Sequence, residues 1–531
     1  MLSKGMDARC GYRMRRVSAE GTCPMDEDII NEVLESRAKA MDAARPEAVA
    51  KVHARDKFTA RERIAMVLDE GSFVEYGVLA VPANKSMSGP ADGLVQGFGT
   101  VAGHPVGIAS YDYTVQGGTQ TALNHGKFDR LLELVHDRRW PLVTFADGGG
   151  ARAHDLAGSQ RGLTGRWGTF DGMAVLSGWV PTVSVVSGRS FAGNASIAGL
   201  SDFIVATRDS AIGMGGPPLV EGAMGLKLTP DEIGPAEMHD RVGGIDLMVE
   251  TEAEAIDAAG RYLRYFLYDL PEGEPDPWAE RIRGIVPSNR RRAYDMRRVI
   301  RAIMDRDSVF ELRPTWAPQL ITALARLGGR SVGIIANQPL SVIAGAIDSN
   351  ASDKIARFVQ LCDAHEIAMV SLVDNPGYMV GRPAEEAGIA RHHARPIIAH
   401  QNRTVPLYTI QLRKAYGLGP AAMGNSYAPR DIRLAWPTAE SGGMGLEGAS
   451  LLVNRDRIRE VERDDPAEAK RLRDEWANEM RERNSAINAG RRYEFDDVIA
   501  PEETRDVLIA MLRMTPRAPL SPIKKHPVDA W

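Results

Sequence analysis

The chain has 531 residues, 44% of them hydrophobic and 25% charged, which is enough apolar material for the cores of about two to four domains. Its formal net charge of −5 gives no general electrostatic reason to bind nucleic acid or a membrane surface. No apolar run approaches the roughly 20 residues of a membrane span, and residues 1–24 lack the apolar core of a secretory signal. Three widely separated cysteines exclude a disulfide framework and a cysteine-based zinc site. We therefore expect a globular protein of the cytoplasm.

The predicted elements begin with helices and continue as alternating strands and helices. Residues 26–44 carry apolar side chains at helical spacing, and Thr59 with Glu62 forms a capping box for a helix that Gly71 is expected to end. Further along, apolar residues at i, i+3, i+4 and i+7 predict a helix over 128–135. Apolar runs predict three strands, at 142–146, 180–186 and 203–206. Alternation of this kind favours an α/β fold with buried strands.

An internal repeat divides the chain into two halves. Four local patterns recur 225 to 227 residues later: Gly103–Ile108 as Gly329–Ile334, Lys127–Leu131 as Lys354–Phe358, Asp147–Gly150 as Asp374–Gly377, and Val180-Pro181 as Val405-Pro406. We therefore predict two copies of one α/β domain. The expected boundaries are a tail at 1–25, a first domain at 26–275, a linker at 276–284, a second domain at 285–520 and a tail at 521–531.

Each predicted copy carries two glycine-rich turns directly after apolar strands. The turns are Asp147-Gly148-Gly149-Gly150-Ala151-Arg152 and Phe191-Ala192-Gly193-Asn194-Ala195 in the first copy, and Asp374-Asn375-Pro376-Gly377-Tyr378 and Tyr416-Gly417-Leu418-Gly419-Pro420 in the second. A strand that turns sharply into a helix leaves the first N–H groups of that helix unpaired, and glycine lets a ligand oxygen approach them. Such turns suit an oxyanion on a thioester or amide carbonyl. The alternative is that the small residues merely permit tight strand-to-helix packing, but four turns in register favour the functional interpretation.

Several stretches together resemble the carboxyltransferase (beta) subunits of biotin-dependent acyl-CoA carboxylases, across residues 30–515. They are Thr59–Phe73, Asp92-Gly93 with Gly97, Asp112–Gly118, Asp147–Arg152, Tyr294–Met296, Val332–Pro339, Ala356–Phe358, Arg413–Gly417, Ala435–Pro437 and Val498–Pro501. The resemblance implies two tandem crotonase-like domains built from ββα superhelix repeats. The first domain is expected on the acyl-CoA side of the site and the second on the biotin side.

The resemblance also implies the reaction and the partners. Carboxybiotin on a separate carrier protein transfers its carboxyl group to the α-carbon of an acyl-CoA, through two enolates that each place negative charge on a carbonyl oxygen. The biotin carboxylase and the biotin carboxyl carrier belong to an alpha subunit on another chain, since this chain has no Walker A loop and no biotin-accepting Met-Lys-Met. A homodimer, built up into a hexamer, is the implied assembly. No metal, nucleic acid or membrane is expected.

Mapped onto this sequence, the resemblance assigns residues to two sites. Donors to the thioester oxygen are Ala192, Gly193 and Asn194, and donors to the biotin ureido oxygen are Leu418 and Gly419. The cofactor-binding positions are Gly149, Gly150, Ala151 and Arg152 on the CoA side, and Gly377, Tyr378, Tyr416, Gly417 and Ala421 on the biotin side. Arg152 is expected either to pair with a CoA phosphate or to fasten its own loop through an ion pair.

The sequence departs from the family pattern at four places. Family members commonly have Gly-Gly at Ala192-Gly193 and at Leu418-Gly419, and Ser-Gly-Gly-Ala-Arg-x-Gln-Glu at residues 148–155. Ala421 stands where propionyl-type enzymes have Asp, which points to another acyl chain. Two further functions stay open: a biotin-dependent decarboxylase, and a non-catalytic acyl-CoA-binding or assembly subunit. A crotonase hydratase is disfavoured, because neither half has a clear paired Glu.

Overall fold

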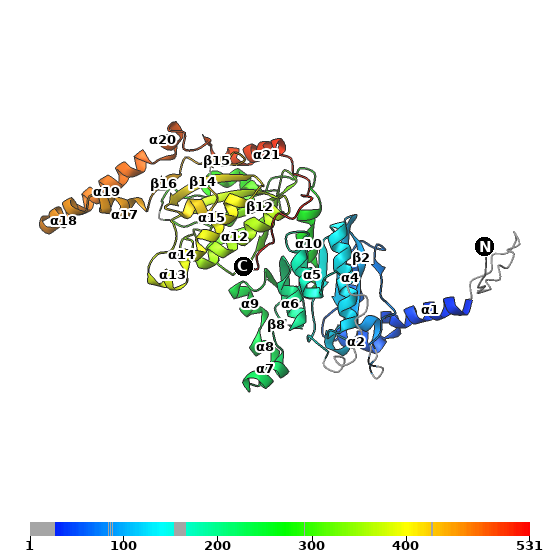
Figure 1. Ribbon diagram of the computed structural model, residues 1–531. Coiled ribbons are helices and arrows are strands. Elements are labelled where there is room, and N and C mark those ends of the chain that lie inside the picture. The colour runs from blue at the N-terminus through cyan, green and yellow to red at the C-terminus, as the bar shows by residue number, and fades with distance from the viewer. Residues whose placement is uncertain are drawn as a thin grey trace, which may run out of the picture.

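The structure is a computed structural model that describes residues 27–82, 84, 87, 89–152, 166–290, 292–425 and 428–531 (Figure 1). The tail predicted at 1–25 lies outside these residues. Within the described part of the chain, no helix combines the length and the apolar character needed to cross a bilayer.

Each half is built on one twisted sheet, and the two sheets have the same strand order. The first sheet runs β1-β2-β3-β4-β5-β7-β9 and the second β10-β11-β12-β13-β14-β15-β17. In both, the first three strands pair antiparallel and the following ones pair parallel. The strands of the first half are β1 (Val74–Glu75), β2 (Leu94–Val101), β3 (His104–Tyr111), β4 (Leu142–Phe145), β5 (Thr182–Val186), β6 (Arg189–Phe191), β7 (Phe203–Thr207), β8 (Ala211–Gly213) and β9 (Leu247–Val249). Those of the second half are β10 (Phe310–Leu312), β11 (Leu320–Leu327), β12 (Arg330–Asn337), β13 (Ala368–Asn375), β14 (Leu407–Tyr416), β15 (Ile432–Ala435), β16 (Glu440–Gly442) and β17 (Asp497–Val498).

The helices cover these sheets and also project from them. In the first half they are α1 (Glu27–Ala40), α2 (Pro46–His53), α3 (Ala60–Val67), α4 (Ala122–Arg138), α5 (Thr169–Leu176), α6 (Gly193–Gly199), α7 (Pro217–Met224), α8 (Pro230–Ile233), α9 (Ala236–Val242) and α10 (Glu252–Leu267). In the second half they are α11 (Met296–Ile303), α12 (Ser349–Ala364), α13 (Arg382–Glu386), α14 (Ile389–His392), α15 (Ala394–Asn402), α16 (Gly419–Ala422), α17 (Leu446–Val453), α18 (Arg455–Asp464), α19 (Pro466–Arg483), α20 (Ala486–Arg491) and α21 (Thr504–Met514). Figure 1 shows α7 with α8 and α17 with α18 and α19 as arms that extend away from the body.

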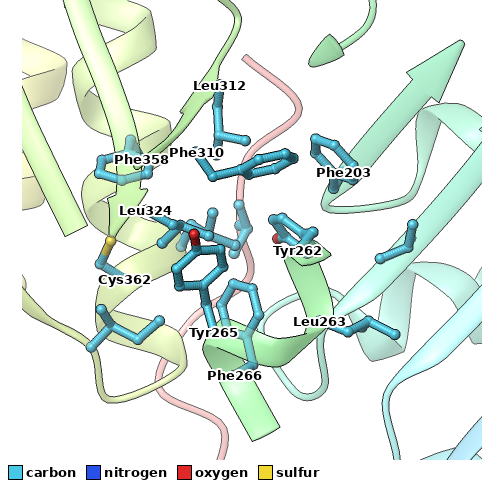
Figure 2. Packing of buried hydrophobic residues seen from close by; sticks show 14 of the residues in the cluster. Phe203, Tyr262, Leu263, Tyr265, Phe266, Phe310, Leu312, Leu324, Phe358 and Cys362 are labelled. Carbon is cyan, nitrogen blue, oxygen red and sulfur yellow. The ribbon is translucent and has the colours of Figure 1, made fainter. Parts of the chain in front are cut away.

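The two halves share one apolar core, which Figure 2 shows at close range. Helix α10 contributes Tyr262, whose ring stacks on Phe203 of the first sheet with centroids 4.4 Å apart. Phe203 in turn packs on Phe310 of the second sheet at 5.7 Å. Full burial of such side chains stabilises by roughly 1.5–3 kcal/mol each, so the halves are held in a fixed relation.

The segment at 521–531, predicted as a tail, packs across the junction of the two halves. The Ser177 hydroxyl in the first half donates to the Val528 carbonyl and accepts from the Val528 N–H, both at 3.0 Å. In the second half, Lys525 and His526 both contact Asp363, with a His526 Nε2 to Asp363 Oδ2 distance of 2.9 Å. The end of the chain therefore ties one half to the other.

Local sequence signals correspond to the observed elements with small shifts. The capping box of Thr59 and Glu62 is formed at the start of α3, which ends at Val67, before Gly71. The single helix expected over 26–44 is instead α1 followed by a short 3-10 helix, because Met41 adopts an extended conformation between them. The predicted linker at 276–284 is largely a 3-10 helix over Pro277–Gly284, and its N-cap Asp276 accepts from the Trp278 N–H.

Candidate active site

A buried ion-pair network fixes the end of β4. Arg63 lies 2.9 Å from Asp147 and 2.6 Å from Glu252. Desolvation by burial lowers the pKa of its guanidinium, but the attraction of the two carboxylates outweighs this, so the pKa is raised above its usual value. Asp147 Oδ1 also accepts from the N–H groups of Ser187 and Gly188, at 3.0 and 2.9 Å. Asp147 therefore joins the end of β4 to the end of β5.

The second half repeats this arrangement at the end of β13. Asp374 pairs with Arg413 at 2.9 Å, and its Oδ1 accepts from the Lys414 N–H at 3.2 Å. Arg413 also lies over the Tyr294 ring, 5.0 Å from its centroid. Each half thus uses one buried Asp–Arg pair to hold together the two strand ends that carry the glycine turns.

Most N–H groups of the first strand-end turn are used inside the protein. Those of Gly148, Gly149 and Gly150 donate to the Arg189 carbonyl, the Gly117 carbonyl and the Asn194 side chain, at 2.7, 3.2 and 3.0 Å. The Ala151 N–H has no acceptor in the described chain. Ala151 forms a parallel bridge with Gln120, whose own backbone pairs with residues 150 and 152, so the Ala151 N–H faces the opposite side.

The second turn of this half follows β6. Ala192 has φ +50° and ψ −119°, a strained conformation for a residue with a side chain, and its N–H donates to the Gly213 carbonyl at 2.9 Å. Ala192 thus bends the chain but is not a free donor, contrary to the role expected for it. Gly193 and Asn194 begin α6, where no preceding turn of helix accepts from their N–H groups. Gly150 lies close to this turn. A Cβ added to Gly150 would be 3.6 Å from the Gly193 nitrogen.

The second half has the same pair of turns. Tyr378 forms the parallel bridge with Ile347 that corresponds to the bridge of Ala151, and Gly417 has φ +58° and donates to the Gly442 carbonyl at 2.9 Å, as Ala192 does to Gly213. In the described chain the N–H groups of Tyr378, Leu418 and Gly419 then remain without acceptors. The Leu418 side chain is 60% exposed, so it extends outward from this turn.

The remaining predicted site residues lie beside these turns. Arg152 is buried and pairs with Asp92 at 2.6 Å, which agrees with the loop-fastening alternative for this residue. Tyr416 donates from its hydroxyl to Glu440 at 2.5 Å, and the Tyr378 hydroxyl donates to the His393 carbonyl at 3.2 Å. Ala421 is half-buried in α16, and its role in acyl-chain selection stays a prediction. The family departures at His154 and Asp155 lie outside the described residues.

Two cavities adjoin the buried Asp–Arg pairs. The first, of about 1700 Å³, lies between the N-terminal helices and the first sheet, and its lining includes Asp147, Ser187, Gly188 and seven basic residues: Lys39, Arg45, Lys51, Arg55, Lys57, Arg63 and Arg189. The second, of about 780 Å³, is lined in part by Arg413, Lys414, Tyr416 and Glu440. The basic side chains that line both cavities suit anionic ligands. Among the described residues, no group of three or more potential protein ligands is placed to hold a metal ion.

Sequence reasoning missed the side chains that support the turns. Arg63 and Glu252 lie far from Asp147 in the sequence, so nothing local links the three residues. Asn375 belongs to one of the predicted glycine turns, but the sequence suggested no role for it. In the structure its Oδ1 accepts from the Gly377 N–H at 2.7 Å. The internal repeat could have drawn attention to the role of Arg413. Arg413 lies 226 residues after Ser187. Ser187 contacts the strand-end aspartate of the first half, Asp147, and Arg413 contacts that of the second half, Asp374.

Comparison with known proteins gives one consistent family. Residues 51–528 match the carboxyl transferase domain family. The methylmalonyl-CoA carboxyltransferase 12S subunit of Propionibacterium freudenreichii subsp. shermanii is 37% identical over 494 residues, covering 90% of this chain and 92% of that protein. The carboxyltransferase subunit of propionyl-CoA carboxylase from Haloferax mediterranei is 35% identical over 517 residues, covering 94% and 98%.

Solved structures agree with this assignment. A transcarboxylase 12S crystal structure, a hexamer with methylmalonyl-CoA bound, matches with a TM-score of 0.82 and 33% identity, covering 96% of this chain and 99% of that one. A single-chain, multi-domain long-chain acyl-CoA carboxylase matches with a TM-score of 0.83 and 42% identity over 92% of this chain, which spans about half (49%) of that protein. These matches confirm the expected family and the double crotonase-like fold. The chain therefore belongs to the carboxyl transferase domain family, as a carboxyltransferase enzyme of acyl-CoA carboxylation.

Proposed function

We propose that this chain moves a carboxyl group from biotin, carried on a separate protein, to the α-carbon of an acyl-CoA, with one pair of glycine turns serving each substrate. The observation that carries this proposal is the repetition of the same donor arrangement in both halves. In the first half, the N–H of Ala151 in the strand-end turn and that of Gly193 in the helix turn are left for a ligand. In the second half, the corresponding N–H groups are those of Tyr378 and Leu418.

The first half supplies the acyl-CoA site in this proposal. The cavity of about 1700 Å³ is large enough for a nucleotide-containing ligand, and its basic lining suits the CoA phosphates. Arg45 and Lys57 in that lining already pair with Asp112 and Asp209, at 2.9 Å each. Lys51, Arg55 and Arg189 form no ion pair with another described residue, so these are our candidates for the phosphates.

The backbone donors of this half act on the thioester. Loss of the α-proton turns the thioester into an enolate, whose negative charge concentrates on the carbonyl oxygen. N–H groups of Ala151 and Gly193 held at this oxygen would stabilise the charge without reorganising, and one such donor is worth about 2.7–4 kcal/mol. The enolate carbon then forms a bond to CO2, and the charge moves to the new carboxylate.

The second half supplies the biotin site. A ureido carbonyl needs N–H donors, and Tyr378, Leu418 and Gly419 carry N–H groups without acceptors in the described chain. Tyr416, which precedes the second of these turns, lines the second cavity. When bound, carboxylated biotin supplies both the carboxyl group and, once that group has left, the base that accepts the α-proton. No side-chain general base is then required of this chain, and its turns hold the ureido oxygen while the proton moves.

We further propose a dimer-based assembly, expanded to a hexamer, in which the first half of one subunit faces the second half of its partner. The hexamer assembly of the 12S relative supports the hexamer in this proposal. The carrier and the biotin carboxylase would then come from a partner alpha subunit, as in a two-component carboxylase.

The proposal is tested by carboxyl transfer in vitro. The chain is mixed with a biotinylated carrier, its biotin carboxylase, ATP and labelled bicarbonate, and acyl-CoAs of increasing length are supplied. We expect label in one acyl-CoA class, with the preferred length reporting on the Ala421 position. No label with any acyl-CoA, despite acyl-CoA binding, would instead support the non-catalytic subunit.

A second candidate, decarboxylation, uses the same site in the opposite direction. It is favoured by one relative, the methylmalonyl-CoA decarboxylase subunit alpha of Veillonella parvula, 33% identical over 498 residues. Release of CO2 from methylmalonyl-CoA in the presence of a biotinylated carrier but without ATP would favour this candidate.

A further inference from the structure

One buried asparagine side chain fills the space between the two turns of each half. In the first half it is Asn194, whose Oδ1 accepts from the Gly150 N–H at 3.0 Å. In the second half it is Asn375, whose Oδ1 accepts from the Gly377 N–H at 2.7 Å. Both side chains are fully buried. The acceptor contact is therefore the same in the two halves.

The two asparagines come from opposite turns. Asn194 lies on α6, two residues after the bend at Ala192. The corresponding residue of the second half is Gly419, which lies two residues after the bend at Gly417. Asn375 directly follows the strand-end aspartate, and the corresponding residue of the first half is Gly148. Asparagine and glycine have therefore exchanged places between the halves.

The available space explains why glycine faces each asparagine. A Cβ on Gly148 would lie 2.7 Å from Cγ of Asn194, and a Cβ on Gly419 would lie 2.7 Å from Cγ of Asn375. Carbon atoms this close overlap well inside their normal separation of about 3.5–4.0 Å. Each half thus has room for one carboxamide between its turns, supplied from either side.

The orientation of each carboxamide is set by its neighbours. A backbone N–H can only donate, so the atom that faces Gly150 or Gly377 is the amide oxygen. The Nδ2 atoms of Asn194 and Asn375 are then buried and have no acceptor in the described chain. Leaving such a donor unsatisfied costs about 1–3 kcal/mol, which an apolar filler of the same space would avoid.

We propose that Asn194 and Asn375 are equivalent positioning residues, one for each oxyanion site, and this inference rests on the proposed function. Each side chain locks the strand-end turn by accepting from Gly150 or Gly377. The NH2 group, which has no acceptor in the described chain, places the positive end of the amide dipole between the two turns that carry the proposed oxyanion donors. Asn194 thus serves the thioester through its side chain as well as its backbone, and Asn375 serves the ureido group.

Reciprocal exchange of the two residue types tests the proposal in the second half. Labelled carboxyl transfer to the acyl-CoA that wild type prefers in the length series is measured for wild type, Asn375→Gly, Gly419→Asn and the double variant, with affinity for that acyl-CoA measured separately by calorimetry. We expect each single variant to lose roughly 100-fold in kcat, as for loss of one oxyanion donor, at unchanged affinity for that acyl-CoA. The double variant recreates the pattern of the first half and is expected to recover most of that loss.

Asn375→Asp separates electrostatic positioning from simple packing. Aspartate keeps the shape and the acceptor for the Gly377 N–H but replaces the NH2 group with negative charge, so kcat of the folded variant should fall. The buried carboxylate has no cation partner and also lowers the melting temperature, so kcat is measured well below that temperature. Equal activity of Asn375→Asp and wild type, or a folded double variant no better than the single ones, would overturn the inference and leave the transfer function standing. Absence of transfer by wild type with every acyl-CoA would overturn the proposed function and this inference together.

Discussion

Gly193→Ala is the substitution that probes the thioester donors most selectively. A Cβ at this position would lie 1.9 Å from Oε1 of Gln120 and 3.3 Å from Cζ of Phe170, so either the turn moves or the Gln120 amide gives up its hydrogen bond to Tyr111. If the Gly193 N–H then misses the enolate oxygen, kcat should fall by about 100- to 1000-fold, or roughly 2.7–4 kcal/mol. Acyl-CoA affinity should change far less, because the CoA contacts that we propose lie in the cavity of about 1700 Å³, whose lining does not include Gly193.

Two companion variants make the assay of labelled carboxyl transfer decisive. Gly199→Ala, at the other end of α6, meets no atom within 4 Å and is expected to leave kcat unchanged. Gln120→Ala combined with Gly193→Ala removes the obstructing side chain, which is otherwise held by its hydrogen bond to Tyr111, and should restore part of the activity. Wild-type kcat in a folded Gly193→Ala variant would refute the assignment of this N–H to the thioester.

The remaining predictions concern the supports of the site. Arg63→Met leaves two buried carboxylates without their cation and should lower the free energy of unfolding by about 3–5 kcal/mol in denaturant melts. Ala192→Gly relieves a backbone strain of about 1–3 kcal/mol against a flexibility cost of about 0.5–1 kcal/mol, so its melting temperature should rise, and a fall would contradict the assigned strain. The pKa of His526 is raised chiefly by its hydrogen bond to Asp363, so its contribution is present in acid and lost as pH rises through that pKa. His526→Gln should therefore lower the melting temperature at pH 5 more than at pH 9, and an equal effect at both would exclude the ion pair.

Local chemistry made the overall fold predictable from the sequence. The capping box at Thr59 and the glycine turns after apolar strands depend on residues close in sequence, and the recurrence of those turns identified the two halves. The break at Met41 escaped prediction because the flanking residues all suit a helix.

Contacts between distant segments were beyond such reasoning. Arg63 meets Glu252 across 189 residues, and the chain end meets Ser177 across 351, so no spacing rule connects them. In the described chain, N–H groups without acceptors occur at the predicted turns, and their role in binding stays a prediction. The Ala192 N–H is not among them, because it donates to Gly213, a contact that depends on the pairing of β6 with β8. The exchange between Asn194 and Asn375 is visible only once both turns are placed in space.

The position of the thioester oxygen in a complex tests the central claim most directly. A crystal structure of this protein with an acyl-CoA bound should place that oxygen about 2.7–3.1 Å from the Gly193 nitrogen, with the Ala151 N–H on the same atom and the CoA phosphates among the basic residues of the first cavity. An acyl-CoA bound with its carbonyl away from both N–H groups, in the protomer and across any subunit contact, would contradict the account.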